Sequence, residues 1–508
     1  MDVSLAAASP CAGLTGFYAG RAKNVQDADL AVTLNLLCDG GRYKAQFFTS
    51  DGDYEGDAVA SGPARVTVKF DTGVALGTAD LVQKNNVLTG TFNLGNDPGT
   101  LEATRIGDAK PADAMRPRLD LTPAEWRQDV RALAVGLPKM HANAFFSLKK
   151  SEFDGEIAGL EGRAEKANGD EMFVGVKQIT KSIGDGHTGM GDPPDRRVMP
   201  IGIARFGGDF RVTEAGPGLD QALGARVLKI GGMPMAQVWD RVLTLTSRAE
   251  SQGFREADAP VFLSRGYALH GLDVIPDRNH AIYTLQDNAG PVFDLDVRGL
   301  KPGQDAKMKS IHPAGALRYQ RPDDGFWCKP LPEARAVYCN WRSYEDLKAK
   351  AAAMFALIGR SNPSKLILDM RDNGGGDNTV GFAEIVAPVK ALAAINAPGH
   401  LYVLIGPLTF SAAMNNAAQF QDQTKAVLVG QAIGERPNSY QEPRQFHLPN
   451  SHLVVRVSTR WYAFRKQGPN RVAPDKEIIP RWSDVARGRD PVLDWILSQP
   501  ANEGVGRR

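Results

Sequence analysis

The chain has 508 residues, and its 60 lysine and arginine residues nearly balance its 58 aspartate and glutamate residues, which leaves a net charge of +2. This balance, without any basic block or acidic tail, argues against a nucleic-acid partner and against binding to an anionic membrane surface. Hydrophobic residues make up 43% and charged residues 23% of the chain, and no apolar run is long enough for a membrane span, which is typical of a soluble protein of several domains.

The amino terminus and the cysteines bear on the compartment. Residues 1–11 lack a basic start and an apolar core, so they are not a signal peptide. They are compatible with a mature end that carries an added Met1 after removal of an export signal. The four cysteines fall into two local pairs, Cys11 with Cys38 and Cys328 with Cys339, which fit disulfides in an oxidising compartment. Four free thiols are the alternative. The sequence thus favours a periplasmic or secreted protein, with the cytoplasm as the alternative.

Residues 1–106 are predicted to form a β-rich amino-terminal domain. Short apolar runs such as 30–36, 43–48 and 65–70 alternate with turns that contain Gly, Asp and Asn. This spacing predicts a small antiparallel sandwich or barrel. The run contains no catalytic constellation, so a binding or docking role and a purely structural role are both open. Residues 107–118 are predicted to be a linker.

Residues 119–190 are predicted to be a helical segment. Thr122-Pro123 is a start signal for a helix, and apolar residues at helical spacing follow it. A later helix ends in the loop Gly184-Asp185-Gly186-His187-Thr188-Gly189. A histidine in a glycine-rich loop directly after a helix can point into a distant cleft, although a lone histidine is more often structural.

Residues 191–310 are predicted to be a β-rich module with one short helix. Residues 210–212 and 225–232 read as strands, and residues 238–243 as the helix. This pattern resembles a degenerate PDZ-like module. A module that serves only for packing is the alternative.

Residues 325–500 are predicted to be an α/β core. Strands at 336–338, 366–370, 401–405 and 426–429 alternate with helices at 344–358, 380–395 and 490–497, and residues 436–440 are predicted to be a loop. Two strands break into small or polar residues before a helix, where α/β sheets present functional groups. Glycines 374–376 leave backbone N–H groups uncovered, and Ser411 lies at a strand-to-helix turn that would expose its hydroxyl.

Several motifs carry a family resemblance. Leu368-Asp369-Met370-Arg371-Asp372-Asn373-Gly374-Gly375-Gly376 and Thr409-Phe410-Ser411-Ala412-Ala413 resemble the two core motifs of the tail-specific (C-terminal processing) serine peptidases. Residues 183–188, 427–430 and 472–475 also resemble motifs of that family, so the resemblance covers roughly residues 119–500. It implies a ClpP/crotonase-like α/β core, and a PDZ-like module that can bind the carboxyl end of a substrate.

The general base for Ser411 separates two branches of this family. A serine hydroxyl needs a neighbour that accepts its proton. One branch uses a lysine twenty-five residues after the serine, but this chain has Arg436 there, and arginine stays protonated. The tricorn-like branch uses an upstream histidine, a position that His187 matches. The resemblance therefore implies a Ser411–His187 pair, with His187 as general base and then general acid.

The resemblance also implies the rest of the catalytic site. The oxyanion hole would consist of the backbone N–H of Gly374 or Gly375 together with that of Ala412. A carboxylate should orient the imidazole, and three candidates stay open: Asp185, Asp475 and Glu477. A hydroxyl of Thr188 or Ser439 is a candidate for a bridging group.

Residues after Ser411 are candidates for substrate binding. Arg436 would hold a substrate carboxylate through two parallel hydrogen bonds, although a structural salt bridge is an equal alternative. Asn438 and Tyr440 are predicted to line the same pocket. No histidines fall at metal-ligand spacing, and no phosphate loop or dinucleotide fingerprint is present, so no metal and no cofactor is predicted.

These features predict a serine-type peptidase that forms an acyl-enzyme at Ser411 and acts on a peptide or protein substrate, as a monomer or a homo-oligomer. One alternative is a non-catalytic ligand-binding protein on the same fold, since the family includes retinoid-binding relatives. Another is an esterase or amidase that acts on a non-peptide substrate. Whether His187 and Ser411 come within hydrogen-bond reach distinguishes the enzyme from the carrier.

Overall fold

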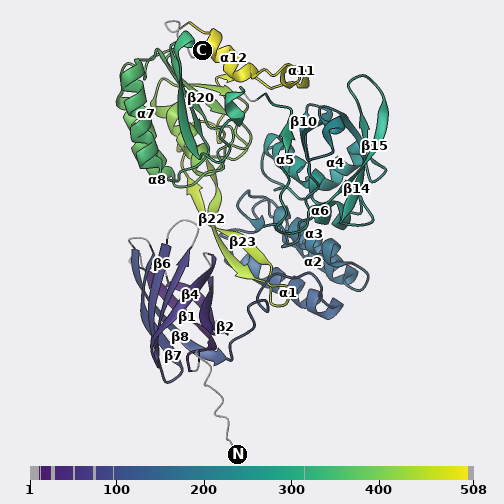
Figure 1. Ribbon diagram of the computed structural model, residues 1–508, viewed down its shortest axis with the longest axis vertical. Coiled ribbons are helices and arrows are strands. Elements are labelled where there is room, and N and C mark those ends of the chain that lie inside the picture. The colour runs from purple at the N-terminus through teal and green to yellow at the C-terminus, as the bar shows by residue number, and fades with distance from the viewer. Residues whose placement is uncertain are drawn as a thin grey trace, which may run out of the picture. The chain divides into compact units, whose positions relative to one another are not determined.

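The structure is a computed structural model that describes residues 11, 13–24, 29–49, 52–71, 76–94, 97–313 and 315–500. The chain divides into two compact units (Figure 1). The first contains residues 1–140 and 443–457, and the second contains residues 141–442 and 458–508.

The first unit contains a closed antiparallel barrel, in which each strand pairs with the next and β8 pairs back to β1. Inward-facing side chains alternate with exposed ones and fill the interior: in β3, for example, Ala45 and Phe47 are buried while Lys44 is exposed. The prediction of an antiparallel β domain is confirmed. The strands are β1 (Gly16–Asn24), β2 (Asp29–Asp39), β3 (Arg42–Thr49), β4 (Asp53–Gly62), β5 (Arg65–Asp71), β6 (Leu76–Lys84), β7 (Val87–Leu94) and β8 (Asp97–Gly107). Helix α1 (Pro123–Met140) follows the barrel.

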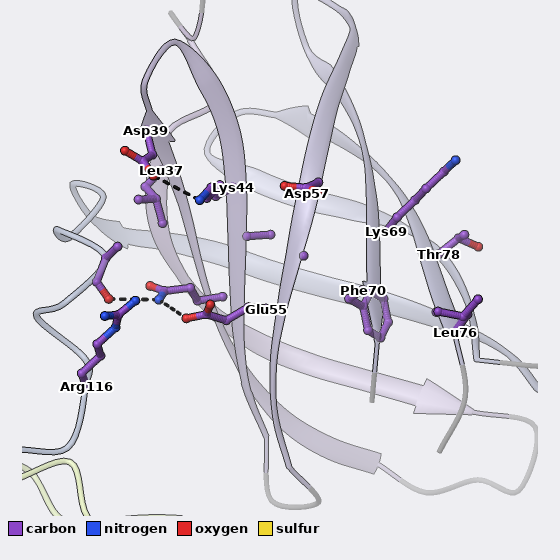
Figure 2. A pocket seen from close by; sticks show the side chains of 15 residues that line it. Leu37, Asp39, Lys44, Glu55, Asp57, Lys69, Phe70, Leu76, Thr78 and Arg116 are labelled. Carbon is purple, nitrogen blue, oxygen red and sulfur yellow. Dashed lines mark hydrogen bonds and ion pairs between the residues drawn. The ribbon is translucent and has the colours of Figure 1, made fainter. Parts of the chain in front are cut away.

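A groove of about 640 Å³ runs over the outer face of β2 to β6 (Figure 2). Charges of both signs line it, with Lys44 paired to Asp39 at 3.1 Å and with Glu55, Asp57 and Lys69 further along. Gln46 lies under the chain that leaves the barrel, where it donates to the Ala112 carbonyl at 3.0 Å. The groove is therefore a feature of the barrel's outside and not a cavity within it.

The second unit begins with two helices and a β-rich module. Its sheet has the order β10-β11-β12-β14-β15, with β13 paired to β12 and β16 to β11. The PDZ-like character of this module stays a prediction. The helices are α2 (Lys150–Arg163), α3 (Gly169–Ser182), α4 (Met235–Leu243), α5 (Gln252–Asp258) and α6 (Gly266–Gly271); the strands are β10 (Ile201–Phe206), β11 (Asp209–Ala215), β12 (Arg226–Ile230), β13 (Met233–Pro234), β14 (His280–Gln286), β15 (Val292–Arg298) and β16 (Lys309–Ser310).

The α/β core is a six-stranded sheet in the order β17-β18-β19-β20-β21-β24, parallel from β18 onwards. The predicted alternation of strands and helices is confirmed, although the expected helix at 380–395 is shorter and contains a π-helical turn at Phe382–Val386. The strands are β17 (Phe326–Leu331), β18 (Ala336–Trp341), β19 (Lys365–Asp369), β20 (Leu401–Ile405), β21 (Val427–Gly430) and β24 (Lys476–Glu477); the helices are α7 (Leu347–Ser361), α8 (Asn378–Gly381), α9 (Ala387–Ala391), α10 (Ala412–Gln423), α11 (Trp482–Val485) and α12 (Pro491–Ser498).

Helices cover both faces of this sheet. Leu366 and Leu368 of β19 belong to an apolar cluster with residues of α7 and α10. Ile367, between them, belongs to a second cluster with residues of α12. Because successive strand residues point to opposite faces, the near-continuous apolar run of β19 is what a doubly covered parallel sheet requires.

A three-stranded sheet of β22 (Asn438–His447), β23 (Val454–Ala463) and β9 (Gly189–Met190) adjoins the core. The prediction of a loop over residues 436–440 is wrong for its last three residues, because Asn438 already begins β22. Residues 439 and 441 are buried between more exposed neighbours, so a strand with one buried face replaces the expected loop. This sheet matters for the site, since β9 begins two residues after His187.

Both local cysteine pairs are disulfides, Cys11–Cys38 in the first unit and Cys328–Cys339 in the second. Cys328 and Cys339 face each other across β17 and β18. Among the described residues, no helix is both long and apolar enough to cross a membrane.

Candidate active site

Ser411 lies at the turn between β20 and α10, as the residue before the helix begins. Its backbone has φ 54° and ψ −123°, a conformation that a residue with a Cβ adopts only at a cost of about 1–3 kcal/mol. Thr409 holds the turn, because its hydroxyl accepts from the N–H of Gly406 at 3.0 Å and donates to the carbonyl of Met370 at 2.8 Å. The side chain is thereby presented at a strained strand-to-helix turn, as nucleophiles of hydrolases often are.

The glycine loop after β19 packs against this turn. The Phe410 N–H donates to the carbonyl of Asn373 at 2.9 Å. A Cβ on Gly375 would lie 2.7 Å from the Cβ of Ser411, and Gly375 has φ +108°, so only glycine fits there. The structure therefore places Gly375 beside Ser411 and Ala412, with Gly374 one residue earlier in the same loop. The Gly375 N–H already donates to the side-chain oxygen of Asn373 at 2.9 Å.

The His187 loop reaches the same place from α3. A Cβ on Gly186 would lie 2.4 Å from the ring of Phe410, and the ring centroids of His187 and Phe410 are 4.8 Å apart. The loop thus lies on the residue that precedes Ser411, and the His187 side chain is only 13% exposed.

The carboxylate that contacts His187 is Glu435, a residue that the sequence analysis missed. Its side chain is fully buried. Its Oε1 lies 3.1 Å from His187 Nε2 and accepts from Gln441 Nε2 at 3.0 Å, and its Oε2 accepts from the backbone N–H of Ser411. A carboxylate only accepts hydrogen bonds, so His187 Nε2 must carry a proton and donate it to Glu435. The other ring nitrogen, Nδ1, then carries the free lone pair of the neutral imidazole. Among the described residues, no hydrogen bond joins the Ser411 hydroxyl directly to His187; one carboxylate joins the two residues.

Within the described part of the chain, none of the three carboxylates proposed from sequence has a hydrogen bond to the His187 ring. Asp475 accepts from the N–H of Leu428 at 2.9 Å. Glu477 is exposed in β24. Asp185 contacts the backbone N–H of His187 at 3.1 Å rather than its ring. Glu435 lies five residues beyond the end of β21, next to Arg436, and no local pattern in the sequence marks it as the partner of His187.

The other predicted residues are arranged around this site as follows. Ser439 approaches Glu435, with its hydroxyl 3.4 Å from Oε1, whereas Thr188 accepts from the N–H of Ser458 at 3.1 Å. Arg436 is exposed. The Asn438 amide donates to the carbonyl of Arg465 at 2.9 Å.

Tyr440 lies on the other face of β22. Successive residues of a strand point to opposite faces, so Tyr440 points away from Ser439 and Gln441, which contact Glu435. Its ring lies 5.2 Å from that of His141 and 4.7 Å from that of Trp461. By the same alternation Asn438 lies on the same face of β22 as Tyr440, whereas Arg436 precedes the strand.

Glu250 supports the His187 loop and predicts a pH dependence. Its Oε1 accepts from the Gly186 N–H at 2.9 Å. Burial raises the pKa of Glu250 to about 8, and the negative charge of Glu435 contributes further. A carboxyl with a raised folded-state pKa contributes stability that is present below its unfolded pKa, near 4.3, and is lost as pH rises through the folded value.

We therefore expect Glu250→Gln, which keeps the hydrogen-bond acceptor, to unfold at a higher temperature than the wild type at pH 8. The difference in unfolding temperature between Glu250→Gln and the wild type should be smaller at pH 5, because Glu250 is neutral in the folded protein at that pH. Thermal unfolding at both pH values measures this, with the exposed residue changed in Glu477→Gln as the control. Equal shifts at the two pH values would contradict the assignment.

A groove of about 720 Å³ lies close to the Ser411 turn. Residues 203–207 of the β-rich module line one part of it, and Pro407 and Leu408 of the turn line another. Within the described residues, no group of three or more His, Cys, Asp or Glu side chains is placed to hold a metal ion.

Comparisons with known proteins give one family match and several structural matches. Residues 337–478 match the model of Peptidase family S41. Mature CPAF complexed with lactacystin has a similar structure over 74% of this chain and 97% of that chain, with a TM-score of 0.50 and 11% identity. The photosystem II D1 C-terminal processing protease matches over 73% of this chain and 98% of its own, with a TM-score of 0.34 and 15% identity. The tricorn protease matches over 92% of this chain and 45% of its own, with a TM-score of 0.37 and 15% identity. A comparison with curated protein sequences gives no match.

Proposed function

The chain carries a Peptidase family S41 domain at residues 337–478, and from this premise we propose that it cleaves peptide bonds through an acyl-enzyme at Ser411. One observation carries the assignment: the buried carboxylate of Glu435 contacts both the His187 ring and the backbone of Ser411. In this proposal Ser411 is the nucleophile, His187 the general base and Glu435 the group that orients the imidazole.

The hydrogen bonds of His187 determine which of its nitrogens takes the proton of Ser411. His187 Nε2–H donates to Glu435, so the Nδ1 lone pair takes the proton of the Ser411 hydroxyl as Oγ attacks the scissile carbonyl. The Glu435 carboxylate stabilises the imidazolium that forms. His187 then returns the proton to the leaving amine, and water hydrolyses the acyl-enzyme by the same route in reverse.

The tetrahedral oxyanion needs backbone donors beside Ser411. The Ser411 N–H donates to Glu435 and the Gly375 N–H donates to Asn373. The N–H groups of Gly374 and Ala412 are the remaining pair from those predicted, and we propose them as the oxyanion hole.

A fluorophosphonate probe tests this function, because it reacts covalently with activated serines. We expect the wild type to be labelled at Ser411, and Ser411→Ala and His187→Ala to be unlabelled while still folded. Ser498→Ala, which removes an exposed serine whose hydroxyl donates to the carbonyl of Trp495 at 2.7 Å, is the control and should keep its labelling. Hydrolysis of denatured casein would then distinguish a peptidase from an esterase. A folded wild type without labelling would refute the proposal and favour the carrier.

We also propose a periplasmic or extracellular location, supported by the two disulfides, since such bonds persist in oxidising compartments. Cell fractionation tests this: the protein should appear in the periplasmic or culture fraction. Recovery only from the cytoplasm, with free thiols, would contradict it.

A further inference from the structure

The Asp185 carboxylate lies beneath the His187 loop and is only 3% exposed. Its Oδ1 accepts from the N–H of His187 at 3.1 Å, the N–H of Thr188 at 2.7 Å and the hydroxyl of Ser458 at 2.6 Å. Its Oδ2 lies 2.9 Å from Nε2 of His141. Burial alone would raise the pKa of Asp185, but the hydrogen bonds from His141 and Ser458 outweigh burial and lower it. Asp185 is therefore a carboxylate with four donors around it.

His141 has a fixed tautomer. Its Nδ1 accepts from the N–H of Asn143 at 2.9 Å, so the ring proton is on Nε2 and is donated to Asp185. The ring is fully buried and packs against Tyr440 and Phe146. Since both ring nitrogens are occupied, this histidine is not available as a base for Ser411.

Two further polar side chains hold the other backbone atoms of the loop. The Lys181 ammonium donates to the carbonyl of Thr188 at 3.2 Å, and Glu250 accepts from the N–H of Gly186 at 2.9 Å. The backbone from residue 186 to residue 188 is thus fixed at several points, while the His187 side chain extends to Glu435. A loop held in this way costs little reorganisation during the reaction.

We propose that Asp185 and His141 form a positioning pair for His187: together they fix the backbone of the loop so that the imidazole meets Glu435 and Ser411. The inference rests on the proposed role of His187 as the base. It assigns to His141 a function in the site without any contact to the reacting atoms.

Asp185→Asn tests the pair because it is nearly isosteric. The amide oxygen can still accept on the Oδ1 side, but the amide NH₂ then faces the Nε2–H of His141, donor against donor. Asp170→Asn is the matched control: Asp170 is also a buried carboxylate, 2.8 Å from Nδ1 of His270, in the same unit.

The main readout is the ¹³Cε1 NMR signal of His187, assigned with His187→Gln. We expect this signal to shift and broaden in Asp185→Asn and to stay at its wild-type position in Asp170→Asn. Fluorophosphonate labelling should slow by about 10- to 100-fold in Asp185→Asn only, since a misplacement of about 1 Å can have such an effect. Adding His141→Gln, whose amide oxygen can accept from the new amide, should restore part of the rate.

An unchanged His187 signal in Asp185→Asn, or an equal change in Asp170→Asn, would overturn the inference. A wild type that does not react with the probe would refute the proposed function, while the NMR comparison would still decide whether the pair positions His187.

Discussion

Glu435→Gln is expected to lower the rate of fluorophosphonate labelling by about 10²- to 10⁴-fold, the range for replacing the orienting carboxylate of a serine triad. The carboxylate accepts from His187 and Gln441 on Oε1 and from Ser411 on Oε2. An amide can accept on one of these sides only. Whichever way the substituted amide turns, its NH₂ faces a donor, either the His187 ring or the Ser411 N–H. In the first orientation the His187 tautomer is no longer fixed, and in the second the Ser411 turn loses its hydrogen bond.

The control for this prediction is Asp475→Asn. Asp475 was an equal candidate by sequence, but it accepts from the Leu428 N–H and should leave the labelling rate within about twofold of the wild-type rate, as expected for a group that acts on neither nucleophile nor base. Thermal unfolding of both variants shows whether either is merely misfolded. Slow labelling in Asp475→Asn together with normal labelling in Glu435→Gln would show that Asp475, and not Glu435, orients the His187 imidazole.

The parts of the site that follow from strand order were predictable. The Gly374–Gly375 loop follows β19 and the Ser411 turn follows β20, and these strands are parallel neighbours. Their carboxyl ends must therefore meet at one edge of the sheet, and both motifs are visible as short apolar runs that break into small residues. Nothing beyond local pattern was needed to place them together.

Glu435 was not predictable in the same way. It follows β21, the next parallel strand, but its direction depends on the chain that returns from residue 430 to β22. That return is set by the pairing of β22 with β23 and of β23 with β9, three segments far apart in the sequence. The loop predicted at residues 436–440 concealed this strand. A carboxylate one residue before Arg436 therefore carried no local sign of its partner.

The same physical reason explains the barrel and the His141–Asp185 pair. Alternating strands predicted an antiparallel domain, but a sandwich and a barrel differ by whether β8 closes on β1, a contact between the two ends of the domain. His141 and Asp185 are 44 residues apart, and neither has a neighbour in sequence that reveals the other. Long-range contacts of this kind become visible only in the fold.

Arg371→Met is expected to lower the free energy of unfolding of the α/β core by about 3–5 kcal/mol, because it leaves buried carboxylates without their cation. Arg371 is 5% exposed and donates to Asp369 through Nε and Nη2 at 2.9 and 2.6 Å, and to Asp490 through Nη1 and Nη2 at 3.0 and 2.6 Å. It thereby links the end of β19 to the start of α12, close to the glycine loop. Urea unfolding followed by tryptophan fluorescence measures the loss.

Two comparisons separate this effect from a simple loss of packing. Lys150→Met removes an exposed ion pair with Asp154 and should cost less than about 0.5 kcal/mol. In the wild type, burial alone would raise the pKa of Asp490, but Arg371 outweighs burial and lowers it. Without Arg371, only the Leu493 N–H and the charge of Arg318 still oppose burial, so Asp490 binds its proton more readily in the folded state than it does in the wild type. The difference in free energy of unfolding between the wild type and Arg371→Met should therefore become smaller as the pH falls from 7 towards 4. A loss of packing alone would lower the free energy of unfolding equally at both pH values.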